Sequence, residues 1–150
     1  MSISVPDGAG PASAELERFV RGTLGCTCPD AVFERVETRE GPPLPGGGRM
    51  RRIAIGGRLL VDLIEGVLVE DVKRDIQAWT RSGRIERDRA GLNRFRLVIG
   101  LDGLDPADAG GIQDAFAAAC DAGDDRMHLH VVESDAIPAL HLWPTQDGRD

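Results

Sequence analysis

The chain has 150 residues, of which 41% are hydrophobic and 29% are charged. This length suits one domain with a buried core, and the composition argues against a disordered chain. With 18 basic and 25 acidic residues the formal net charge is −7, which disfavours nucleic acid as a partner.

Membrane insertion and export are both unexpected from the sequence. No apolar run approaches the about 20 residues that span a bilayer, so we expect no membrane partner. Residues 1–11 contain no basic residue and no long apolar stretch, unlike a secretory signal. Three cysteines are too few for a disulfide scaffold, which favours a reducing, cytoplasmic location.

The N-terminal part predicts a flexible start followed by a helix. Residues 1–12 are rich in Gly, Pro and Ser, a composition typical of a frayed terminus. Ser13 is a suitable cap for a helix over 13–24, and Gly25 fits a left-handed helix end. The helix has apolar residues at helical spacing, so we expect one face to be buried; these are Leu16, Phe19, Val20 and Leu24.

The middle of the chain carries the strongest strand pattern. Residues 36–39 are expected to be extended, and the Gly- and Pro-rich segment 41–48 predicts a loop. Over 51–65, branched apolar residues surround Gly56 and Gly57. This pattern fits either a tight hairpin or one long bulged strand.

The second half alternates helical and strand patterns. We expect a helix from residue 70, with Val72, Ile76 and Trp79 facing inward, that reaches residue 89 with a break near 82–83. The remaining expected elements are a strand over 94–100, a helix over 105–120, a strand over 127–133 and a tail over 134–150.

This element order predicts an α/β fold. A strand–helix–strand–helix–strand stretch indicates parallel strands joined by helical crossovers, and the hairpin adds antiparallel pairing. We therefore expect a single domain over 13–133 with a mixed sheet of about four to five strands and a helical N-terminal segment.

The most chemically suggestive motif is Cys26-Thr27-Cys28-Pro29. Pro29 suits the first position of a short helix, which would place Cys28 at its N-cap, where peptide dipoles lower the pKa of a thiol. Cys28 could then attack a disulfide as a thiolate, and Cys26 could resolve the mixed disulfide. The alternative is that both are small apolar residues beneath the first helix.

A metal site is a second possibility for the same pair. His128 and His130 are expected on one face of a strand, because alternate residues share a face. Together with Cys26 and Cys28 they would form a Cys2His2 set suited to zinc or copper. The spacing lacks the second short ligand loop of a zinc finger, and two structural histidines are the simpler interpretation.

Charge is distributed unevenly along the chain. Segment 73–96 holds eight positive and three acidic residues, a net charge of +5, whereas 101–125 holds seven aspartates and no positive residue. Arginines at 81–96 could bind a phosphate, an acidic peptide or RNA, but a solvated helix face is the simpler interpretation. Segments 73–96 and 101–125 could complement each other within the fold or between subunits of an oligomer.

Standard catalytic motifs are missing, including the P-loop, GxSxG and HExxH. Asp102, Asp105 and Asp108 lie at an expected strand-to-helix junction and could hold Mg²⁺, although such residues are common in loops and caps. The sequence does not decide whether the protein is an enzyme. It favours a small cytoplasmic accessory protein with a redox-active or metal-binding cysteine pair, with a non-enzymatic oligomeric interaction module as the alternative.

Overall fold

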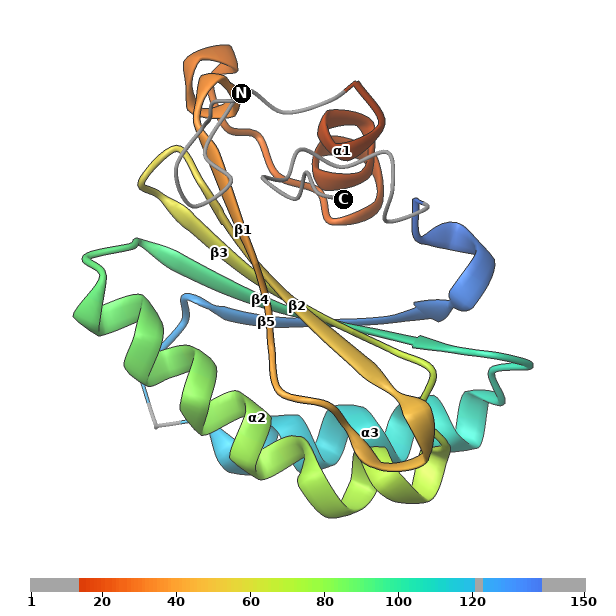
Figure 1. Ribbon diagram of the computed structural model, residues 1–150. Coiled ribbons are helices and arrows are strands. Elements are labelled where there is room, and N and C mark those ends of the chain that lie inside the picture. The colour runs from red at the N-terminus through yellow and green to blue at the C-terminus, as the bar shows by residue number, and fades with distance from the viewer. Residues whose placement is uncertain (1–13, 121–122, 139–150) are drawn as a thin grey trace.

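A five-stranded mixed sheet forms the centre of the protein (Figure 1). The computed structural model describes residues 14–120 and 123–138. The sheet has the order β1-β2-β3-β4-β5, antiparallel from β1 to β3 and parallel from β3 to β5. The predicted α/β class and mixed sheet are confirmed. The strands are β1 (Val36–Glu40), β2 (Arg49–Ile55), β3 (Leu59–Glu65), β4 (Arg94–Leu101) and β5 (Met127–Glu133).

The segment over 51–65 forms a hairpin and not a single bulged strand. Ile55 pairs with Leu59, so the chain reverses over the three residues between them. Gly56 and Gly57 both have positive φ angles, of 62° and 70°, which glycine adopts without steric cost. The glycine pair therefore sets both the position of the turn and the register of β2 against β3.

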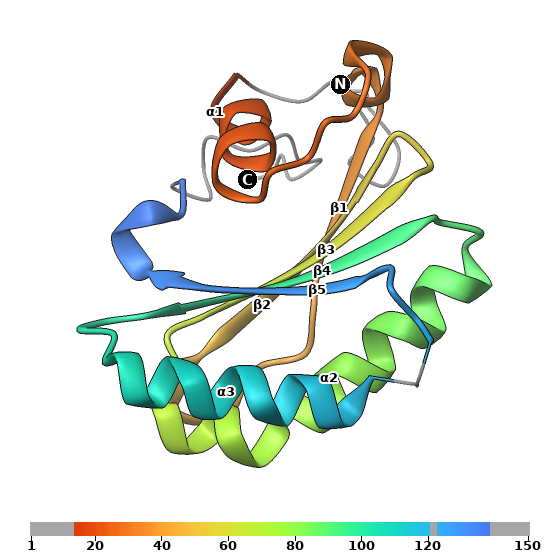
Figure 2. The ribbon, with the colours of Figure 1, turned by 180° about the vertical axis from the view of Figure 1, so that it is seen from behind.

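Two long helices cover one face of the sheet. α2 (Val69–Arg89) joins β3 to β4, and α3 (Pro106–Ala119) joins β4 to β5. Figures 1 and 2 show both helices on the same side. Their buried side chains meet alternate residues of β3, β4 and β5, which confirms the inward face predicted for α2; the buried helix residues include Val72, Ile76, Trp79, Ile112 and Phe116.

The predicted break near residues 82–83 is wrong, because α2 is continuous to Arg89. Gly83 is buried against the Phe95 ring of β4, and a β-carbon at this position would overlap that ring. The glycine therefore allows α2 to pack closely against β4, and it does not end the helix. Sequence alone does not distinguish these two uses of a helical glycine.

The N-terminal segment covers the opposite face of the sheet (Figure 2). α1 (Ala14–Arg18) continues as a wider π-helical turn, η2 (Phe19–Thr23), and a 3₁₀ turn, η3 (Asp30–Glu34), follows. The predicted apolar face is buried, and Gly25 has the expected left-handed conformation, with φ of 73°. After β5, η5 (Ser134–Ala136) leads to Ile137, which joins the same core.

Parts of the sequence analysis fall outside the described residues. These are the flexible start over 1–12, the helix cap at Ser13 and the tail beyond residue 138. Within the ranges 14–120 and 123–138, none of the helices has the length and apolar character that crossing a bilayer requires.

Candidate functional site

Cys26 and Cys28 lie in the connection between η2 and η3 and are joined by a disulfide. Their Cα atoms are 5.5 Å apart. The Cys26 N–H donates to the Val20 carbonyl at 3.1 Å, which fixes the connection to the end of η2. The Cys28 N–H approaches the Cys26 sulfur at 3.3 Å. The local backbone therefore brings the two sulfurs together, as the spacing suggested.

One expectation about this pair is wrong, and the alternative of burial beneath the first helix applies to one of the two cysteines. Cys26 is only 8% exposed, because it packs in the core with residues of α1 and η2, and only Cys28 is half-buried. The residue that caps η3 is Pro29, in an extended conformation, and not Cys28. A five-residue 3₁₀ turn also has a small dipole. The helix N-terminus that the sequence analysis expected at Cys28 is therefore not the source of activation for this thiol.

The cysteine pair opens onto a cleft of about 260 Å³ between the N-terminal segment and one end of the sheet. The Arg58 carbonyl at the hairpin tip accepts hydrogen bonds from the N–H groups of Asn93, at 2.7 Å, and Arg94, at 3.0 Å. These bonds fix the hairpin tip against the start of β4. The cleft is lined by Gly25, Cys26, Thr27, Cys28, Arg58, Leu59, Asn93, Arg94 and Arg96. We refer to it as the cysteine cleft.

The cysteine cleft is strongly positive. Arg94 and Arg96 are two residues apart on β4, so they point to the same face of the sheet, and Arg58 joins them from the hairpin. Among the described residues that line this cleft there is no carboxylate. Burial, and then the charge of Arg94, lower the pKa of Arg96, and its Nε atom is buried without a hydrogen-bond partner.

His128 and His130 lie on the same face of β5, as predicted, and this is the face covered by the N-terminal segment. Nη1 of Arg96 is 2.9 Å from Nε2 of His130. Burial, followed by the charge of Arg96, lowers the pKa of His130 to about 4. Burial also lowers the pKa of His128. Both rings are therefore neutral near pH 7.

The predicted Cys2His2 set is not assembled. Within residues 14–120 and 123–138, no three or more His, Cys, Asp or Glu side chains are grouped so that they could hold a metal ion. The His130 Nε2 atom, a usual ligand atom for zinc or copper, faces a guanidinium group instead. Binding of a soft metal by Cys26 and Cys28 alone stays a prediction.

The aspartates after β4 have structural roles in the described part of the chain. Asp105 accepts a hydrogen bond from the Ala107 N–H at 2.8 Å and caps α3, and Asp108 lies 3.5 Å from the Lys73 ammonium group. Asp102 is exposed in the turn that begins this loop. The three side chains do not converge on a shared Mg²⁺ position.

Segments 73–96 and 101–125 partly neutralise each other within the chain. α2 lies beside α3 in Figure 1, and the Lys73–Asp108 pair joins them. Arg87 is 2% exposed and donates two hydrogen bonds, at 3.1 and 3.0 Å, to the Asp124 carboxylate. These contacts match the intramolecular alternative of the sequence analysis. They do not test whether the protein forms oligomers.

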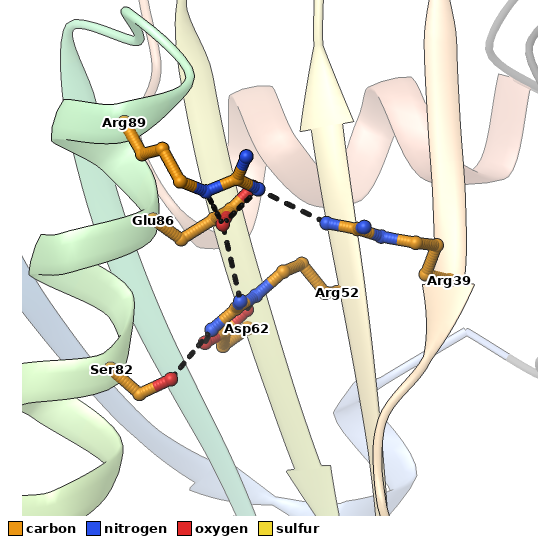
Figure 3. A network of polar contacts seen from close by, with 6 residues as sticks. All are labelled: Arg39, Arg52, Asp62, Ser82, Glu86 and Arg89. Atoms are coloured by element: carbon orange, nitrogen blue, oxygen red, sulfur yellow. Dashed lines mark hydrogen bonds and ion pairs between the residues drawn. The ribbon is translucent and has the colours of Figure 1, made fainter.

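A second cleft, of about 550 Å³, lies between β1, β2 and the end of α2, and its arginines face carboxylates (Figure 3). Arg52 donates two hydrogen bonds, at 2.8 and 2.7 Å, to the fully buried Asp62 of β3. Glu86 of α2 accepts from Arg89 at 2.6 Å and from Arg39 at 3.3 Å. Because each of these guanidinium groups already faces a carboxylate, the larger cleft has little charge left for a ligand.

The acids of this network have pKa shifts in opposite directions. Burial raises the pKa of Asp62, and the hydrogen bonds from Arg52 act against the shift. Burial also disfavours ionised Glu86, but the hydrogen bond and charge of Arg89, with the charges of Arg52 and Arg39, lower its pKa. The sequence analysis missed this network. The signal was an Asp within an apolar strand, opposite an Arg once the hairpin register is known.

Comparisons with protein-family models, curated proteins and solved structures give no match. The functional argument therefore depends on the geometry of the cysteine cleft.

Proposed function

We propose that the protein carries out thiol–disulfide exchange through Cys26 and Cys28, in a reducing compartment such as the cytoplasm. The observation that supports this most directly is that the linked pair lines a cleft open to small molecules. Cys28 is the more accessible of the two and is the attacking thiol, whereas Cys26, buried beside it, is the resolving thiol.

The proposed reaction has two steps. The Cys28 thiolate attacks one sulfur of a substrate disulfide, forming a mixed disulfide and releasing the first substrate thiolate, which takes up a proton. Cys26, deprotonated by solvent, attacks the Cys28 sulfur, forms the Cys26–Cys28 disulfide and releases the second substrate thiol. The substrate gains two electrons and the cysteine pair loses two. Two equivalents of a low-molecular-weight thiol regenerate the dithiol.

The arginines of the cysteine cleft support this chemistry. Exchange requires a thiolate, and neighbouring cations stabilise a thiolate relative to the thiol. Arg58, Arg94 and Arg96 line the cleft with both cysteines. Their combined positive charge would lower the pKa of Cys28, the effect that the sequence analysis assigned to a helix N-terminus.

The test uses Cys120→Ser as the background, because Cys120 is the third cysteine and takes no part in the disulfide. The fully reduced protein is mixed with bis(2-hydroxyethyl) disulfide and the products are followed by mass spectrometry. We expect Cys26→Ser to accumulate a mixed disulfide on Cys28, because the resolving thiol is missing. Cys28→Ser should react more slowly, since Cys26 is buried.

A direct comparison with Cys120 decides the outcome. In the native, reduced wild-type protein, the Cys26/Cys28 pair should react with the disulfide at least about tenfold faster than Cys120, because thiolate fraction and accessibility both favour the pair. If Cys26 and Cys28 become reactive only after unfolding, the proposal is wrong and the disulfide has a structural role.

A further inference from the structure

The cysteine cleft differs from the rest of the surface in how its arginines are paired. Elsewhere most arginines face carboxylates, as Arg52 faces Asp62 and Arg87 faces Asp124. In the described part of the chain, the structure gives no ion pair to Arg58, Arg94 or Arg96. A protein with a net charge of −7 thus keeps around one small cleft three guanidinium groups that face no carboxylate of the described residues.

Unpaired cations held close together carry an energetic cost that an anion relieves. The charge of Arg94 repels that of Arg96 on the same strand, and the Nε atom of the desolvated Arg96 has no hydrogen-bond partner in the described part of the chain. A carboxylate can accept two parallel hydrogen bonds from a guanidinium group, and this geometry is specific for planar oxyanions. The cleft therefore has the chemistry of a carboxylate-binding site.

We propose that the cysteine cleft selects small disulfides and thiols that carry carboxylate groups, with Arg58, Arg94 and Arg96 as the specificity-determining residues. This inference rests on the proposed function, because the ligand is a substrate only if Cys26 and Cys28 carry out the exchange. The volume of about 260 Å³ admits one half of such a disulfide, with its sulfur toward Cys28 and its carboxylate toward the arginines.

The positions of the arginines are compatible with selection of anionic disulfides without a lower rate of thiol–disulfide exchange. Arg58 and Arg94 are exposed at the hairpin tip and at the start of β4, so they can meet an incoming anion before it reaches the sulfurs. Arg96 is half-buried deeper along the same strand face and is held by His130. Electrostatic attraction by such a cluster raises the rate of encounter and is weakened by salt.

The experiment compares three disulfides of similar length and different charge: 3,3′-dithiodipropionate, bis(2-hydroxyethyl) disulfide and cystamine. Each disulfide is used to oxidise the reduced Cys120→Ser protein. The rate measured for a disulfide with the protein is then divided by the rate of the same disulfide with dithiothreitol, which corrects for differences in intrinsic reactivity among the three disulfides. We expect the dianion to react about tenfold faster than the neutral disulfide and the dication to react slowest, with differences that shrink in 0.5 M NaCl.

Arginine variants locate the selectivity. Arg58→Gln and Arg94→Gln should each lower the normalised rate with dithiodipropionate several-fold more than the rate with the neutral disulfide, whose smaller decrease reflects the loss of Cys28 thiolate alone. Arg81→Gln is the matched control, because Arg81 is an exposed arginine of α2 outside the cleft. Equal normalised rates for all three disulfides, or equal effects of Arg94→Gln and Arg81→Gln, would overturn the inference and leave exchange itself standing.

A binding measurement separates this inference from the proposed function. The Cys26→Ser/Cys28→Ser protein cannot exchange, but its arginines remain, so dithiodipropionate should still shift the backbone amide resonances of Thr27, Asn93 and Arg94 in a saturable way. Cystamine should not do so. If the wild-type cysteines prove unreactive while this binding persists, the carboxylate site stands without the redox role. If dithiodipropionate causes no saturable shifts, the carboxylate site is wrong.

Discussion

The guanidinium group of Arg96 on β4 lies 2.9 Å from Nε2 of His130 on β5. An arginine side chain can only donate, so Nε2 must accept, and the His130 ring is neutral with its proton on Nδ1. This contact links the cysteine cleft to the neighbouring strand and gives His130 a role that the sequence analysis did not foresee. The contact orients the Arg96 side chain.

The protein should lose stability as the pH falls from neutral. Burial and then Arg96 lower the pKa of His130 from 6.5 to about 4. Between these values the unfolded chain takes up a proton that the folded protein does not, so the free energy of unfolding decreases with decreasing pH. His130→Gln keeps an acceptor for Arg96 and does not titrate. Denaturation with urea at several pH values should show a shallower slope for this variant, and an unchanged slope would contradict the assignment.

Gly83→Ala should destabilise the protein despite the higher helix propensity of alanine. The new methyl group would overlap the buried Phe95 ring, and such overpacking typically costs about 1–3 kcal/mol. Gly110→Ala is the control, because Gly110 is exposed on α3 and a β-carbon there meets nothing within 4 Å. This control should stabilise by about 0.5–1 kcal/mol. The prediction is confirmed if the urea midpoint of Gly83→Ala is lower than that of the wild type and the midpoint of Gly110→Ala is higher. A Gly83→Ala variant more stable than the wild type would refute it.

Asp124→Asn should be destabilising, because it leaves the buried Arg87 guanidinium with the more exposed Asp88 as its remaining carboxylate. Breaking a buried pair costs at most about 3–5 kcal/mol, and the Asp88 contact reduces that cost here, whereas Asp108→Asn, at the more exposed pair with Lys73, should cost less than about 1 kcal/mol. The hydrogen bond from Arg87 lowers the pKa of Asp124. The stability contributed by the charged carboxylate is therefore lost as pH falls below about 4, and wild type and variant should converge there.

Removing one partner of the Arg52–Asp62 pair should lower the free energy of unfolding more than replacing both partners with apolar residues. Asp62→Leu alone removes two hydrogen bonds of Arg52 and leaves its guanidinium group with Ser82 and the more distant Glu86, so it should destabilise by about 3 kcal/mol. The double variant Arg52→Met/Asp62→Leu removes both charges and should recover most of that loss. A double-mutant cycle from thermal or urea unfolding measures the coupling. Additive effects of the two substitutions would mean that the pair is not coupled.

Much of the fold was predictable because its elements carry local signals. Gly56-Gly57 indicates a hairpin, Pro106 follows a capping aspartate, and the apolar positions of α2 repeat at helical spacing. The role of Gly83 in helix packing was not predictable. A glycine that ends a helix and a glycine that makes room for an aromatic ring of another element look the same in the sequence.

The candidate site was predictable only in part. The Cys26–Cys28 pair is local, so its proximity follows from spacing alone. The arginines around it come from a hairpin tip and from the beginning of β4, and only the register of the sheet brings Arg58 to Arg94. The burial of Cys26 likewise depends on how the N-terminal segment packs on the sheet, which no spacing within the segment determines.

The placement of both crossover helices on one side has a consequence for shortened forms of the protein. Ile53, Val61 and Val98 on the other side are shielded mainly by residues that precede β1. A fragment that starts at Val36 would keep every strand and both long helices, but the apolar face of its sheet would be exposed to water. Such a fragment should self-associate face to face, and adding back a peptide that spans residues 14–35 should dissolve the aggregates and restore the solution state of the intact chain.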